Sequence, residues 1–187
     1  MNDLQALVLF VRERGACREA RAWLATQSDP RAAWEACERP DWMIECAYQR
    51  GVRPEIFVRI ACDCARTVLW LVPEDEDRPW LAIEAAERWT RGEATIDEVR
   101  AARVAVLAVD AGTEREHKAV CAAADAAEAA DAANYAGRYV AAASYVAYAA
   151  AQATADAADA YAGTRKQADI QMCQIIRARL RYEDVAL

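Results

Sequence analysis

The single histidine of the chain, His117, lies four residues before Cys121. Residues four apart share a face of a helix, so the imidazole could act as the base that activates the thiol. The residues around His117, namely Glu114, Glu116 and Lys118, are typical of a solvated helix surface. Because this spacing is also common by chance, we expect His117 to be a surface residue and the protein not to be an enzyme.

Cys62-Asp63-Cys64 brings two of the seven cysteines close together in sequence. The spacing is not that of a CxxC motif, and on a helix the two thiols point to different faces. With only one histidine available, a zinc site would need cysteines from distant parts of the chain. We therefore expect no metal and no other cofactor.

The densest run of charge is Glu74-Asp75-Glu76-Asp77, directly before the Arg78-Pro79 pair that starts a predicted helix. Acids at a helix start are stabilised by the helix dipole, and we expect Asp77 to cap this helix. That role accounts for one or two of the four acids. The rest favour a surface that steers a basic partner.

A second acidic row, Asp125, Glu128 and Asp131, recurs every three residues, and Asp156 and Asp159 repeat the spacing later. Two carboxylates could serve as general acid and base. Acids on two helices could also hold metal ions as in ferritin-like bundles, but that requires Glu-x-x-His pairs, which the sequence lacks. The row is then either a solvated stripe or a second docking patch.

The segment that carries these acids, residues 122–162, is more than half alanine. Alanine is the best helix former, and its small side chain lets two helices approach closely. Tyr135 and Tyr139 are four apart and share a face. They either pack over a thin alanine interface or act as aromatic anchors of a contact surface, since binding hot spots favour tyrosine and tryptophan.

Helical periodicity and helix breakers predict an all-α protein without strands. Predicted helix starts are Pro30, Pro40, Pro54 and Pro79, and predicted stops are Gly15, Gly51, Gly92 and Gly112. Residues 1–92 form a short-helix part rich in Trp and Cys. Residues 93–187 form a long-helix part rich in Ala and Tyr, which opens with a Thr95–Glu98 capping box. We predict one continuous domain, in which the short helices pack on a bundle or hairpin of long ones.

The net charge of −7 and the pI of about 4.9 argue against direct nucleic-acid binding, which needs excess lysine and arginine. The acidity suits a basic protein partner, or it serves only solubility. No apolar run is long enough to span a membrane. The odd number of cysteines and the lack of a signal peptide predict a cytoplasmic protein with reduced, mostly buried thiols.

Three stretches carry a family resemblance: ERPDWMIECAYQRGV, ACDCARTVLWLVPEDEDRPWLAIEAAERWTRGEATIDEVRAA and the alanine–tyrosine tract. Their shared features are Asp41-Trp42 at a helix start, the alanine-cysteine helix at 61–65, and Asp77-Arg78-Pro79 leading into 82–86 and Trp89. Over residues 35–160 or so, the chain resembles the immunity-protein family of bacterial toxin systems. These are small, alanine-rich helical proteins, and phages also carry relatives of them. The resemblance implies inhibition by binding, without catalysis.

The leading expectation is an acidic, immunity-type inhibitor that binds a basic toxin, nuclease or defence effector stoichiometrically. The expected partner-binding residues are Glu74, Asp75, Glu76, Asp77, Asp125, Glu128, Asp131, Tyr135 and Tyr139. One alternative is a phage-encoded anti-defence inhibitor of anti-CRISPR type, whose acids mimic nucleic-acid phosphates. A second is a histidine-dependent enzyme, and a third is a self-associating structural protein that forms a homodimer through its alanine face.

Overall fold

The structure is a computed structural model that describes residues 3–13, 15–136, 143–160 and 163–186. Within these ranges the chain forms helices and no strand, which confirms the all-α prediction. The helices are α1 (Asp3–Glu13), α2 (Arg18–Leu24), α3 (Pro30–Ala36), α4 (Pro40–Gln49), α5 (Pro54–Arg66), the 3-10 helix η1 (Leu69–Leu71), α6 (Arg78–Thr90), α7 (Ile96–Leu107), α8 (Glu114–Ala136), α9 (Ala143–Ala160), α10 (Arg165–Arg179) and α11 (Tyr182–Val185). None of the helices in the described ranges is long and apolar enough to cross a membrane.

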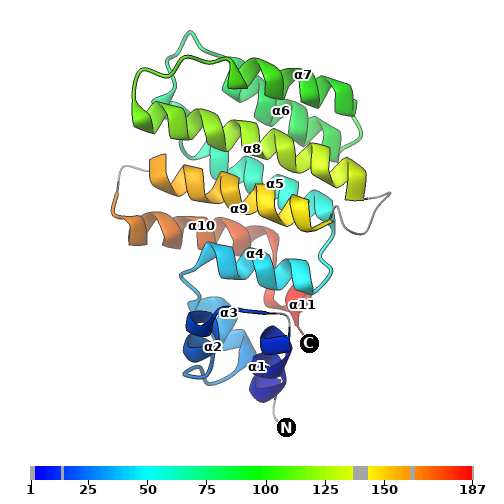
Figure 1. Cartoon of the computed structure of the whole chain (residues 1–187), viewed down its shortest axis with the longest axis vertical. Coiled ribbons are helices and arrows are strands. Elements are labelled where there is room, and N and C mark those ends of the chain that lie inside the picture. Colours follow the sequence, from blue (N-terminus) through cyan, green and yellow to red (C-terminus); the bar gives the residue numbers. More distant parts are fainter. Residues whose placement is uncertain (1–2, 14, 137–142, 161–162, 187) are drawn as a thin grey trace.

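Most helices lie side by side in a two-layer array (Figure 1). One layer contains α7, α8, α9 and α10 as successive neighbours, and consecutive helices run in opposite directions. The second layer contains α6, α5 and α4. Each of these helices packs against neighbours in the first layer: α6 on α7 and α8, α5 on α8, α9 and α10, and α4 on α9 and α10. The helix pair α6–α7 therefore forms one edge of the array.

The alanine-rich helices form the inner wall of this array. The fully buried alanines are Ala119, Ala122, Ala123, Ala126, Ala127, Ala129 and Ala130 on α8, and Ala153, Ala157 and Ala160 on α9 in its described part. Large buried side chains on α5, among them Phe57, Val58 and Ile60, supply the bulk that alanine lacks. Because α5 comes from the first half of the chain and packs on α8 and α9, one core joins the two compositional parts.

The remaining helices, α1, α2, α3 and α11, lie beyond α4 at the opposite end from α6–α7 (Figure 1). Side chains from elsewhere in the chain tie this group to the array. Arg177 on α10 donates hydrogen bonds to the carbonyl oxygens of Trp34 and Cys37, the former at 3.1 and 3.2 Å. Arg50 donates to the carbonyls of Val185 and Ala186. Arginines therefore satisfy backbone carbonyls at ends of α3 and α11.

Local signals place most helix boundaries where we predicted them. Proline occupies the first or second position of α3, α4, α5 and α6. Gly92 follows α6 with a positive φ of 74°, a conformation that favours glycine. Gly112 is no helix stop, however: it lies two residues before α8, and its amide donates to Glu116 at 2.8 Å.

The expected cap of α6 by Asp77 is wrong. Asp77 does occupy the N-cap position, but its backbone is helical (φ −92°, ψ −11°) and its side chain makes no capping hydrogen bond. An N-cap side chain normally reaches the free amides from an extended backbone. Here Glu76 takes the role instead and accepts the amide N–H of Arg78 at 3.1 Å.

Candidate functional site

Two loops meet at one end of the α6–α7 edge. The first, residues 72–77, leads into α6, and the second, residues 108–113, joins α7 to α8. Arg78 bridges them by donating a hydrogen bond to the carbonyl oxygen of Ala108 at 3.3 Å. Asp75 and Asp110, one from each loop, line the same small hollow of about 220 Å³. Chain segments more than 30 residues apart thus bring their acids together.

Four acids at this point face solvent: Glu74, Asp75, Asp77 and Asp110, which we call the acidic end. None of them forms an ion pair with another residue in the described part of the chain, so their charge is not neutralised locally. Glu76, the remaining member of the predicted run, is different. It forms an ion pair with Arg78, and the hydrogen bonds from that guanidinium lower the pKa of Glu76. The run therefore offers three free carboxylates rather than four.

Beside the acidic end, α6 and α7 expose apolar side chains. Leu81 is 47% exposed, Val104 68% and Leu107 57%. We call these three residues the edge strip. Val99 and Val106 carry the buried face of α7, so Val104 and Leu107 are not needed for the core. No other described helix covers this side of the pair, because α6 and α7 end the array (Figure 1).

The second predicted patch is engaged with neighbouring helices. Asp131 on α8 pairs with Arg100 on α7 at 2.8 Å, and Glu128 pairs with Arg103 at 2.5 Å. Asp125 is half-buried and hydrogen-bonds Asp156 on α9. The row therefore connects α8 to the helices on both sides of it, and its negative charge is largely matched within the molecule.

Asp125 has the most unusual electrostatic setting in this row. Burial, the nearby charge of Asp156 and the hydrogen bond to that residue together raise the pKa of Asp125 to about 7. Glu128 adds repulsion, whereas Arg103 acts in the opposite direction. Asp156 itself is held by Lys118 at 2.9 Å. Asp125 is thus a carboxyl group that stays protonated at mildly acidic pH and in that state can donate a hydrogen bond to Asp156.

Of the two predicted aromatic anchors, Tyr139 lies outside the described residues. Tyr135 is 44% exposed, and its hydroxyl accepts a hydrogen bond from Arg100 at 2.9 Å. The same guanidinium lies 5.5 Å from the centre of its ring. Tyr135 sits near the C-terminal end of α8, whereas the acidic end adjoins the start of that helix. At 1.5 Å per residue, the two places are about 30 Å apart.

His117 and Cys121 lie together as their spacing predicts, with Nε2 and Sγ 3.5 Å apart. The setting does not activate the thiol. Burial raises the pKa of Cys121, and the carboxylates of Asp156 and Asp125 raise it further. Catalytic cysteines show the opposite shift, because the thiolate is the nucleophile. The pair therefore lacks the electrostatics of a Cys–His catalytic device.

The other cysteines differ in their exposure. None of the seven forms a disulfide; Cys37, Cys62, Cys64 and Cys173 are buried, and Cys17 is exposed. Among the described residues, no three His, Cys, Asp or Glu side chains are grouped so that they could hold a metal ion.

Sequence reasoning missed the edge strip and Asp110. Only the α7 residues of the strip had a signal: within IDEVRAARVAVL, the valines and leucine occupy more than one face of the helix, and that excess predicts exposed apolar residues. The proximity of Asp110 to Asp75 had no local signal, because it depends on how α6 and α7 pair. No family model, curated protein or solved structure matches this chain.

Proposed function

We propose that this protein acts as a stoichiometric inhibitor of immunity type, which binds a basic protein partner through the α6–α7 edge without catalysis. The observation that carries the proposal is an exposed apolar strip beside unpaired carboxylates: Leu81, Val104 and Leu107 next to the acidic end. Protein interfaces commonly combine an apolar centre with a polar rim.

The charges at this edge favour a partner rich in lysine or arginine. The acidic end carries four carboxylates, and the one guanidinium between its two loops, that of Arg78, is already paired with Glu76. The negative electrostatic potential of these carboxylates would speed the encounter with a basic surface, and salt would weaken this effect. The predicted second patch is a weaker candidate, since Arg100 and Arg103 already neutralise two of its acids.

The test uses two variants with equal charge changes. Glu74→Gln/Asp75→Asn removes two charges from the acidic end, whereas Glu13→Gln/Glu35→Gln removes two exposed charges near α1 and α3. Proteins captured from a lysate of the source cell by the wild type and by the second variant, but not by the first, are candidate partners. For a purified candidate, we expect the association rate of Glu74→Gln/Asp75→Asn to fall about threefold or more and to depend less on salt.

A second pair of variants tests the edge strip. Val104→Asp/Leu107→Asp should abolish binding of the purified partner, whereas Ala101→Asp, at an exposed position on the same helix, should retain most of it. Equal binding and equal salt dependence for all these variants would refute the proposal. A captured toxin supports the immunity role, and a captured host-defence effector supports the anti-defence role. Light scattering that detects a dimer, lost in Val104→Asp/Leu107→Asp, would instead support self-association through this edge.

A further inference from the structure

A large apolar cavity lies at the other end of the molecule from the α6–α7 edge. It is lined mainly by residues of α1, α2, α3, α4 and α11, is partly open to solvent and has a volume of about 930 Å³. Pockets for drug-sized ligands span about 300–1,000 Å³, so this cavity could hold a whole small molecule. The exposed charged residues that line it, Glu19, Arg39, Asp41 and Glu45, mark where it opens to solvent.

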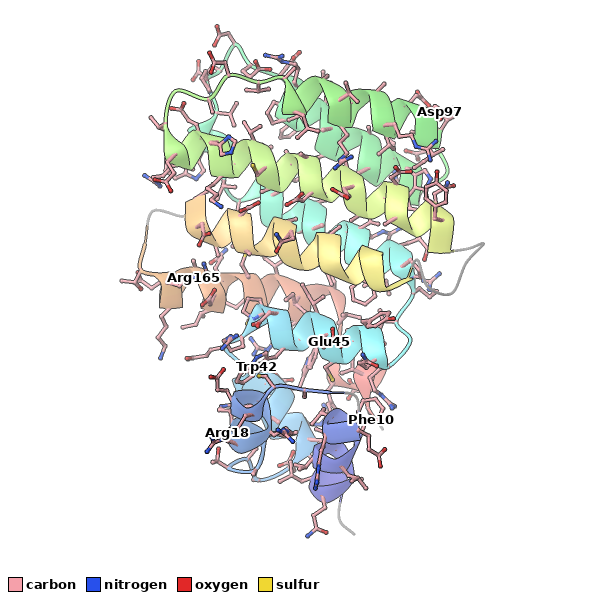
Figure 2. The ribbon with its side chains drawn as sticks, viewed as in Figure 1. Phe10, Arg18, Trp42, Glu45, Asp97 and Arg165 are labelled. Atoms are coloured by element: carbon pink, nitrogen blue, oxygen red, sulfur yellow. The ribbon has the colours of Figure 1, made fainter. Side chains whose placement is uncertain are left out.

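Aromatic side chains from five helices line this cavity. They are Phe10, Trp23, Trp34, Trp42, Tyr48 and Tyr182. Trp23 and Trp42 contact each other, with ring centroids 5.8 Å apart and planes inclined at 53°. Figure 2 labels Phe10 on α1 together with Trp42 and Glu45 on α4, which line the cavity from different helices. We call this space the aromatic cavity.

Water is a poor occupant for such a space. A buried water molecule needs two to four polar partners, and at about 30 Å³ per molecule the cavity would hold roughly 30 of them. Four of the polar side chains of the wall form two hydrogen-bonded pairs. Arg39 donates to both carboxylate oxygens of Asp41 at 2.9 and 2.7 Å, and Gln49 donates to Glu45 at 2.7 Å. An apolar molecule would displace this water at little polar cost.

The charges of the wall restrict the polar end of such a molecule. Arg39 is the one cationic side chain among the described lining residues, and it is held by Asp41 and lies 4.5 Å over the ring of Trp42. A ligand carboxylate would therefore find no free cation. Glu19 and Glu45, by contrast, place negative charge at the mouth, and tryptophan rings attract cations.

We propose that the aromatic cavity binds a small apolar molecule whose polar end is neutral or cationic, such as an alkyl or aryl amine. The apolar body lies among the tryptophans, and the amine lies at the mouth near Glu19 and Glu45. This site is independent of the proposed function, since it lies at the opposite end of the array from α6 and α7.

The experiment measures fluorescence of the neutral probe N-phenyl-1-naphthylamine with the full chain. We expect a saturable rise as the probe enters the cavity. Decyltrimethylammonium and decanoate, which have equal chain length and opposite charge, then compete for the site below their micelle concentrations. The ammonium should displace the probe at about a tenfold lower concentration than the carboxylate.

Matched variants locate the site. Ala20 lines the cavity and Ala22, on the same helix α2, is exposed and does not. Ala20→Phe should weaken probe binding about tenfold or more, while Ala22→Phe leaves it unchanged; circular dichroism checks that both are folded. At the mouth, Glu45→Lys should reverse the preference between ammonium and carboxylate, whereas Glu35→Lys on α3, which does not line the cavity, should not.

Three results would overturn the inference. The first is no saturable probe binding by the wild type, and the second is equal binding by Ala20→Phe and Ala22→Phe. The third is displacement by decanoate as strong as by decyltrimethylammonium, with no change in Glu45→Lys. That result would refute the charge preference on which the ligand class depends.

Discussion

Replacing Asp125 by asparagine should change how the stability of the fold depends on pH. The pKa of Asp125 is raised from its usual 3.8 to about 7 in the folded protein. Well below pH 3.8, Asp125 is protonated in both the folded and the unfolded chain. As the pH rises toward 7, the unfolded chain releases this proton first. The wild type therefore loses stability across this range, and the loss is complete once the folded carboxyl also ionises.

The size of the effect follows from the shift. One pKa unit corresponds to about 1.4 kcal/mol, so three units set an upper limit of about 4 kcal/mol. Asp125 is only half-buried, and solvent screens part of the interaction with Asp156. We therefore expect Asp125→Asn to gain about 1–2 kcal/mol relative to the wild type between pH 4.5 and pH 8. The asparagine amide can still donate to Asp156, as protonated Asp125 does.

Urea unfolding at a series of pH values measures this difference directly. Asp125→Ala provides the control: it removes the ionisable group and the donor together. Its stability difference from the wild type should vary with pH like that of Asp125→Asn, at lower stability throughout. If the unfolding free energies of the wild type and Asp125→Asn stay parallel from pH 4.5 to 8, the pKa of the Asp125 carboxyl is not raised in the folded protein.

Three further predictions concern packing, capping and thiol access. Ala126→Leu, at a fully buried position of α8, should lower the free energy of unfolding in urea by about 1–3 kcal/mol, because the core has no room for the larger side chain. The exposed Ala101→Leu should change the free energy of unfolding by less than about 0.5 kcal/mol. Equal effects would contradict the packing of α8. Thr95→Ala should lower the free energy of unfolding by about 1 kcal/mol through loss of the capping box of α7, whereas Thr95→Ser should retain most of this stability. A Ser variant as unstable as the Ala variant would show that the hydroxyl does not stabilise the helix start. When the native protein is treated with a maleimide, mass spectrometry should find Cys17 labelled first. Cys62 should be labelled only upon unfolding, because it is fully buried. Simultaneous labelling of the two cysteines would contradict the burial of Cys62.

Local chemistry was enough to predict the helices. Prolines at four helix starts, the Thr95–Glu98 capping box and alanine propensity act within a few residues, so they can be read along the chain. The error at Asp77 shows the limit of such reasoning. Capping preferences allow any of several neighbouring acids to cap α6. The backbone conformation of the loop determines that Glu76, and not Asp77, accepts the hydrogen bond from the helix amide.

The arrangement of the helices depends on contacts between distant residues. Nothing in the sequence of α5 indicates that it lies against both α8 and α9, or that the loops holding Asp75 and Asp110 meet. The acidic row on α8 was equally ambiguous, because its pairing with Arg100 and Arg103 requires knowing that α7 lies alongside. The tryptophan-rich composition of residues 1–92 did not indicate that three of the tryptophans, Trp23, Trp34 and Trp42, line a cavity.

The described chain starts at α1 and finishes at α11, and these two helices share one side of the molecule (Figure 1). A fluorescent protein or a surface tether joined to either terminus would therefore extend away from Leu81 and Asp75. Tethered molecules would all present the same side outward, whichever terminus is used. The same attachment would crowd the mouth of the aromatic cavity beside Glu19 and Glu45. A bulky fusion should therefore hinder binding of a small molecule in this cavity and leave binding of a protein partner at the α6–α7 edge intact.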